Sequence, residues 1–159
     1  MSDEGVKDWD AVFTMNAEPR PGINTIMKAF KDGVRRHPNK NFLGTRPPID
    51  KETFGPYQWL TWTEVDTNVT NLARGIMKMN FCPEHEAEGR QWRFVGIWAR
   101  NRQEWLTTLL AGMHFNITNV GFYDAMSINA VDFILKQTKI ETIFCEAGLV
   151  KKVIDMKKK

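Results

Sequence analysis

The sequence contains no glycine-rich loop of the kind that holds a phosphate group. Its eleven glycines are scattered singly along 159 residues, and neither a G-x-G-x-x-G nor a G-x-x-x-x-G-K-[ST] pattern occurs. Both patterns use closely spaced glycines so that backbone amides can approach the phosphate. Their absence argues against a small, self-contained nucleotide-binding module.

Cysteine is also scarce. Cys82 lies in a polar stretch and Cys145 ends an apolar one, and the two form no C-x-x-C pair. No histidine stands at a metal-ligand spacing from either of them. Two isolated cysteines cannot build a disulfide framework or a structural zinc site. We therefore expect two reduced thiols and no metal site.

Long apolar runs and a secretory leader are missing as well. No stretch approaches the about 20 apolar residues that cross a bilayer, and the first residues, Met1–Gly5, are acidic and polar. We expect an intracellular protein that is not secreted and has no transmembrane segment. A cytoplasmic location, an organellar one such as the mitochondrion, and peripheral association with a membrane all stay open.

The positive charge of the sequence is modest. Its net charge is +3, and the lysines and arginines read as interspersed with acidic residues until the last few positions. Nucleic-acid-binding domains concentrate basic residues on one surface. This interpretation therefore predicts no nucleic-acid partner.

The middle of the sequence, residues 92–124, predicts a strand, a helix and a second strand. The runs Phe94–Ala99 and Ile117–Phe122 are short, apolar and bounded by polar residues, as buried strands are. Between them, three large apolar side chains share one helical face: Trp105, Leu109 and Met113. Two strands joined through one helix form a right-handed βαβ unit, so we expect them to be parallel.

The start of this helix has the pattern of a capping box. Asn101 can accept a hydrogen bond from an amide of the first turn, and Glu104, three residues later, can reach back. The pattern predicts that Asn101 is the N-cap of the helix.

The whole sequence predicts an α/β fold: a partial layered sheet of parallel βαβ units, preceded by a hairpin and a helix. Residues 1–22 show no periodicity and are predicted to form an extended N-terminal arm, and residues 23–159 a single incomplete domain. The other predicted features are, in order, a helix over 24–37 capped by Asn24, hairpin strands at 41–45 and 57–62, a helix that Thr63 opens with Asp66, a loop at 81–91, a helix capped by Ser127, a strand at 141–145 and a last helix around 149–154.

Three motifs identify a family. Val95–Trp105 reads V-G-I-W-A-R-N-R-Q-E-W, Val120–Ala125 reads V-G-F-Y-D-A, and Gly55–Val65 reads G-P-Y-Q-W-L-T-W-T-E-V. Together they resemble the N-terminal part of long-chain fatty acid–CoA ligases, the AMP-forming acyl-CoA synthetases of the adenylate-forming superfamily. The resemblance covers about residues 23–145. Gly121 stands where the family has proline, and residues 125–127 read Ala-Met-Ser where it has Thr-Leu-Gly.

The resemblance implies a function for a complete enzyme and a limit for this chain. A complete member joins a fatty acid to CoA, converts ATP to AMP and pyrophosphate, and needs ATP, Mg and CoA. The family's Ser/Thr/Gly-rich phosphate loop, its adenine and ribose motifs and its catalytic lysine have no counterpart here. We therefore predict a segment of the large AMP-binding domain that is catalytically incomplete, binds no cofactor itself and has the remainder of the enzyme as its partner. The alternative is a stand-alone, non-catalytic remnant that serves as a structural subunit of a larger protein assembly.

A few residues are chemical candidates, and each also has a structural interpretation. Arg100 and Arg102 flank the helix start, where an anion could bind, but solvated residues beside a cap are the favoured interpretation. His37 and His85 are expected at the surface, and His114 as a partly buried residue at a helix end. Tyr123 and Asp124 follow a strand end, where α/β sheets place ligands, but a scaffold turn is favoured there. The sequence thus assigns no catalytic, cofactor-binding or metal-binding residue.

Overall fold

At the centre of the molecule lies a three-stranded parallel sheet. The computed structural model describes residues 20–123 and 125–157. In it, β5 (Phe94–Trp98) lies between β6 (Thr118–Phe122) and β7 (Ile143–Cys145), in the order β6-β5-β7. Both pairings are parallel, with Gly96 opposite Val120 on one side and Ile143 on the other. The predicted βαβ arrangement is confirmed.

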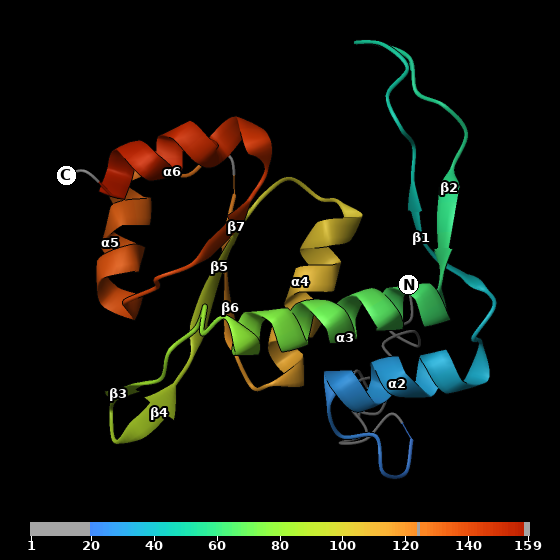
Figure 1. Cartoon of the computed structure of the whole chain (residues 1–159), viewed down its shortest axis with the longest axis horizontal. Helices are drawn as coiled ribbons and strands as arrows, with labels where there is room; N and C mark the ends of the chain where they lie inside the picture. The colour runs from blue at the N-terminus through green and yellow to red at the C-terminus, as the bar shows by residue number, and fades with distance from the viewer. Residues whose placement is uncertain (1–19, 124, 158–159) are drawn as a thin grey trace, which may run out of the picture.

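Helices cover both faces of this sheet. On one face lie α3 (Trp62–Lys78) and α4 (Gln103–His114), and on the other α5 (Ile128–Thr138), the 3-10 turn η1 (Ala147–Leu149) and α6 (Val150–Lys157), as Figure 1 shows. Successive side chains of a strand point to opposite faces. Val95 accordingly packs against α3 and α4, while Trp98 packs with Phe122 and with Val131 of α5. This two-sided cover explains why the central strand is apolar almost throughout.

A second layer of chain precedes the sheet. Helix α2 (Ile26–Arg36) packs through Phe30 on Val65 and Val69 of α3 and on Leu110 of α4. Strands β1 (Asn41–Thr45) and β2 (Gln58–Thr61) form an antiparallel hairpin that projects beyond the helices in Figure 1. The predicted α/β fold, with parallel units after a helix and a hairpin, is confirmed.

Two predicted helix caps are wrong by one or two residues. Thr25, and not Asn24, caps α2, and its hydroxyl accepts a bond from the Lys28 amide at 3.1 Å. Thr61 caps α3 in a complete capping box with Glu64, because β2 ends at Thr61 and α3 begins at the next residue, Trp62. Thr63, the predicted cap, instead donates its hydroxyl hydrogen to the Pro38 carbonyl oxygen at 3.0 Å. The Ser127 cap of α5 is confirmed.

The stretch predicted as a loop at 81–91 contains structure. Strands β3 (His85–Ala87) and β4 (Arg90–Trp92) form a short antiparallel hairpin, and Cys82 beside them is buried under α3. Strand β7 begins at Ile143, two residues later than predicted. The predicted arm lies, but for residues 20–22, outside the described residues, and the domain boundary at residue 23 stays a prediction. Among residues 20–123 and 125–157, no helix is long and apolar enough to cross a membrane.

Candidate functional site

A crevice opens at the carboxyl ends of β5 and β7. Helix α4, which follows β5, lies on one face of the sheet, and α6, which follows β7, lies on the other. The chain thus leaves the neighbouring strands β5 and β7 toward opposite faces of the sheet, and a crevice forms between the two connections. Proteins of the α/β class bind ligands at this position. The fold therefore makes this crevice the candidate ligand site.

The crevice is a hollow of about 310 Å³ with an apolar base. Ile97, Ala99 and Phe144 line it from the sheet, and Trp105 and Thr108 form the wall that α4 contributes. The Thr108 hydroxyl is not free for a ligand, because it donates to the Glu104 carbonyl oxygen at 2.8 Å. The volume is at the lower end of the range for small-molecule pockets.

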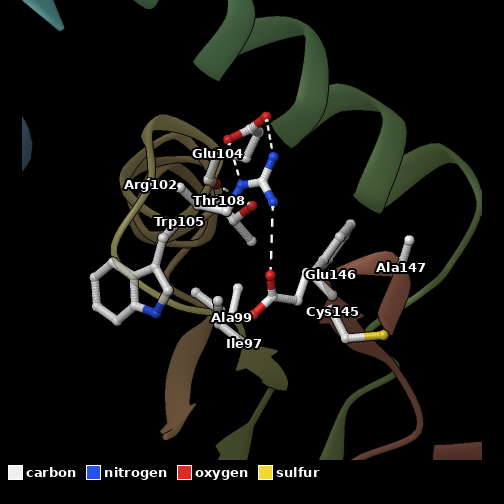
Figure 2. A pocket seen from close by; sticks show the side chains of 10 residues that line it. Ile97, Ala99, Arg102, Glu104, Trp105, Thr108, Cys145, Glu146 and Ala147 are labelled. Carbon is white, nitrogen blue, oxygen red and sulfur yellow. Dashed lines mark hydrogen bonds and ion pairs between the residues drawn. The ribbon is translucent and has the colours of Figure 1, made fainter. Parts of the chain in front are cut away.

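Two arginine–carboxylate pairs form the rim of the crevice. Figure 2 shows the Arg102 guanidinium between the Glu104 and Glu146 carboxylates, and its nitrogens lie 2.7 and 2.8 Å from Glu104 and 4.0 Å from Glu146. Arg100 contacts Glu146 through its backbone amide at 3.3 Å and its guanidinium at 3.3 and 3.4 Å. These pairs connect the end of β5 and the start of α4 to the residue that follows β7.

The arginines of the rim are paired with the carboxylates of the rim. The hydrogen bond from Arg100 holds the pKa of Glu146 below its ordinary value, and the bond from Arg102 lowers that of Glu104. Burial and the nearby Glu146 raise the pKa of the Cys145 thiol, which favours the unreactive thiol over the nucleophilic thiolate. The rim can therefore fix the local backbone, but it offers neither a free cation for a phosphate nor an activated nucleophile.

Asn101 is not the cap of α4, contrary to the sequence prediction. The helix begins at Gln103 with Arg102 in the N-cap position, and no side chain caps it. The carboxylate of Glu104, which a capping box requires, is bound by the Arg102 guanidinium. Because the helix begins at Gln103, Asn101 lies one residue before its N-cap, so the box does not form and Asn101 remains exposed.

The three histidines do not come together with the crevice. His37 is the C-cap of α2, His85 lies in β3 beside the Phe94 ring, and His114 is the last residue of α4. His37 and His85 are half-buried, and His114 is half-buried with its Nε2 atom enclosed and without a hydrogen-bond partner among the described residues. His114 thus matches its predicted place as a partly buried residue at a helix end, whereas His37 and His85 are less exposed than expected.

Tyr123 follows β6 and is exposed, and Asp124 lies outside the described residues. Within residues 20–123 and 125–157, no three His, Cys, Asp or Glu side chains are close enough to hold a metal ion. The absence of catalytic, cofactor-binding and metal-binding residues remains a prediction from the sequence.

Sequence reasoning missed a second hollow, between the hairpin and the start of α4. The Arg46 guanidinium lies 5.9 Å from the centre of the Phe54 ring and 5.8 Å from that of Tyr57, and it also donates to the Phe54 and Gly55 carbonyl oxygens. Leu106 of α4 contributes to the opposite wall. The G-P-Y-Q-W motif was the available signal, because it brings Tyr57 and an exposed Trp59 into the hairpin.

Comparisons with known proteins agree with this architecture. A family model described as AMP-binding enzyme matches residues 30–159. Long chain acyl-CoA synthetase 6, peroxisomal, from Arabidopsis thaliana is 32% identical over 127 residues, 80% of this chain and 17% of that protein. Acyl-CoA ligase 891, peroxisomal, from Penicillium roqueforti is 27% identical over 150 residues, 94% of this chain and 21% of that protein. The chain thus spans about a fifth of the length of these curated relatives.

The solved structures show the same fold at low sequence identity. The adenylation domain of a carboxylate reductase from Mycobacterium chelonae superposes with a TM-score of 0.71 at 14% identity, over 87% of this chain and 22% of that one. A fatty acid AMP ligase from Legionella pneumophila gives 0.58 at 14% identity, over 79% and 20%. With the family model matching most of the chain, these similarities lead to one assignment: the chain belongs to the AMP-binding enzyme family, with acyl-CoA synthetases among its relatives.

Proposed function

We propose that this chain is part of a long-chain fatty acid–CoA ligase and contributes scaffold to its large domain. The observation that carries the proposal is the internally paired rim of the crevice. Arg100 and Arg102, the basic residues of the family-like motif, contact Glu104 and Glu146 and hold two strand ends together. In this proposal these residues fix the backbone of the crevice and take no part in the chemistry of the enzyme.

The chemistry of the complete enzyme would come from residues beyond these 159. Adenylate formation requires donors around the phosphates and a cation that stabilises the developing charge. The sequence has no phosphate loop and no recognisable catalytic lysine. In this proposal the complete enzyme binds ATP, Mg and CoA, acts on a long-chain fatty acid and works inside the cell, in the cytoplasm, in an organelle or at a membrane surface.

The other function, a stand-alone structural subunit of a larger assembly, makes a different prediction about the natural protein. The intact mass of the protein isolated from its source separates the two. A mass several times that of this 18.4 kDa chain supports the ligase, whereas a mass that matches the chain refutes it.

The scaffold role is tested by an activity assay on two proteins. Residues 1–159 and the product of the complete natural reading frame are each incubated with ATP, Mg²⁺, palmitate and CoA while pyrophosphate release is followed. We expect release from the complete product and none above the blank from residues 1–159. Turnover by residues 1–159 that survives repurification would refute the scaffold role.

A further inference from the structure

Positive charge is concentrated at the start of the described chain, although basic residues were expected to be interspersed with acidic ones everywhere but in the last few positions. Residues 20–40 contain six lysines and arginines and a single carboxylate, Asp32, and so carry a net charge of +5. The whole chain carries +3, so all other residues together carry −2. Residues 151–159, with five lysines and one aspartate, form a second basic segment, and the remaining residues carry a net negative charge.

Helix α2 displays this charge on one exposed side. Lys28, Lys31 and Arg35 follow the spacing i, i+3, i+7, which places them in a row along a helix, and all three are exposed. We call these three residues the basic stripe. The opposite side of α2 is occupied inside the protein, where Phe30 and Gly33 are buried. The helix therefore presents cations to solvent on one side and packs most of its other side against the protein, with Ile26 at its first position 61% exposed.

The charges of the stripe and of its neighbours are held in place and only partly neutralised. The Asp32 carboxylate contacts three guanidiniums, those of Arg20, Arg35 at 2.6 Å and Arg36 at 3.2 Å. One carboxylate offsets one of these three charges, and the side chain of Arg35 is still 76% exposed. Within the stripe, Lys31 pairs with Asp66 of α3 at 2.6 Å. Positioned cations in excess over carboxylates form a surface that attracts a polyanion.

We propose that the basic stripe of α2 docks this protein on an anionic phospholipid surface. Clustered lysines and arginines are attracted to the negative potential of such a surface within a Debye length. Because Phe30 and Gly33 on the other side of α2 are buried in the protein, the contact is mainly electrostatic and reversible. A membrane is favoured over a nucleic acid because a long-chain fatty acid partitions into bilayers, and this step alone rests on the proposed function.

The test is a vesicle co-sedimentation titration of residues 1–159 without ATP, fatty acid or CoA. Two variants with equal net charge are compared: Lys28→Gln/Lys31→Gln/Arg35→Gln removes the stripe, and Lys51→Gln/Lys78→Gln/Lys151→Gln removes three exposed lysines elsewhere. Vesicles contain about one quarter phosphatidylserine in phosphatidylcholine, and pure phosphatidylcholine vesicles are the neutral control. Circular dichroism checks that both variants are folded.

We expect binding to the anionic vesicles at low salt, release at high salt and no binding to neutral vesicles. The stripe variant should bind at least about tenfold more weakly than the control variant. Failure of the unmodified chain to bind, equal weakening in both variants, equal binding to neutral vesicles, or tighter binding to duplex DNA than to vesicles would each overturn the proposal. Because no substrate is present, these outcomes leave the proposed ligase function untouched.

Discussion

Replacing Gly112 by alanine should destabilise the protein, although alanine is the better helix former. A Cβ atom at Gly112 in α4 would lie 2.6 Å from both the Nδ2 and the Oδ1 atoms of Asn119 in β6. Asn119 cannot easily move away, because its Nδ2 donates to the Leu109 carbonyl at 3.2 Å and the Ile117 carbonyl at 3.3 Å. The close approach of α4 to β6 therefore depends on a residue without a side chain.

The expected change in the free energy of unfolding combines one stabilising and two destabilising contributions. Alanine improves helix propensity by about 0.5–1 kcal/mol. Overpacking costs about 1–3 kcal/mol, and displacing Asn119 weakens two hydrogen bonds of about 1 kcal/mol each. We expect Gly112→Ala to lower the free energy of unfolding by about 2 kcal/mol.

Urea denaturation followed by circular dichroism measures this change. The control is Gly75→Ala in α3, where no atom lies within 4 Å of the added Cβ, so the substitution should stabilise by about 0.5–1 kcal/mol. Adding Asn119→Ala to Gly112→Ala removes the clash, and the double variant should be more stable than additivity predicts by about 1 kcal/mol. The reasoning is refuted if Gly112→Ala is as stable as the unmodified protein, or if the two substitutions are simply additive.

Further predictions concern the caps and the rim of the crevice. Thr61→Ala breaks the capping box of α3 and should lower the free energy of unfolding, measured in urea melts, by about 1 kcal/mol. Asn101→Ala should change the free energy of unfolding by less than about 0.5 kcal/mol. Equal effects of the two substitutions would contradict the assigned helix starts. The pKa values of Glu104 and Glu146 in the folded protein lie below the ordinary value of 4.5. Their ionised forms therefore stabilise the fold above about pH 4.5, and this stabilisation is lost as the pH falls through the lowered pKa values. The difference in unfolding free energy between the unmodified protein and Glu104→Gln/Glu146→Gln should therefore shrink on acidification below about pH 4.5, and a difference that is constant or grows would exclude these pairs as its source.

The sequence alone determined the parallel core and the family. The apolar runs that became β5 and β6 and the helix between them are local features, and a strand–helix–strand order permits few topologies. Ser127 was predicted correctly as a cap because its bond to the Ala130 amide depends on three residues of local chain. The family motifs are local as well, since each is a continuous run of residues.

Only the tertiary structure decided how distant residues pair. Arg100 finds its partner in Glu146, 46 positions later, because β5 and β7 become neighbours through two crossovers. Cys82 is buried because the chain after α3 passes beneath the helical layer, although it lies in a largely polar stretch of sequence. Asn101 had a valid capping pattern, but Glu104 pairs with Arg102 instead. A sequence pattern specifies which bonds a residue can form, and the energy of the competing contacts in the folded chain decides which one forms.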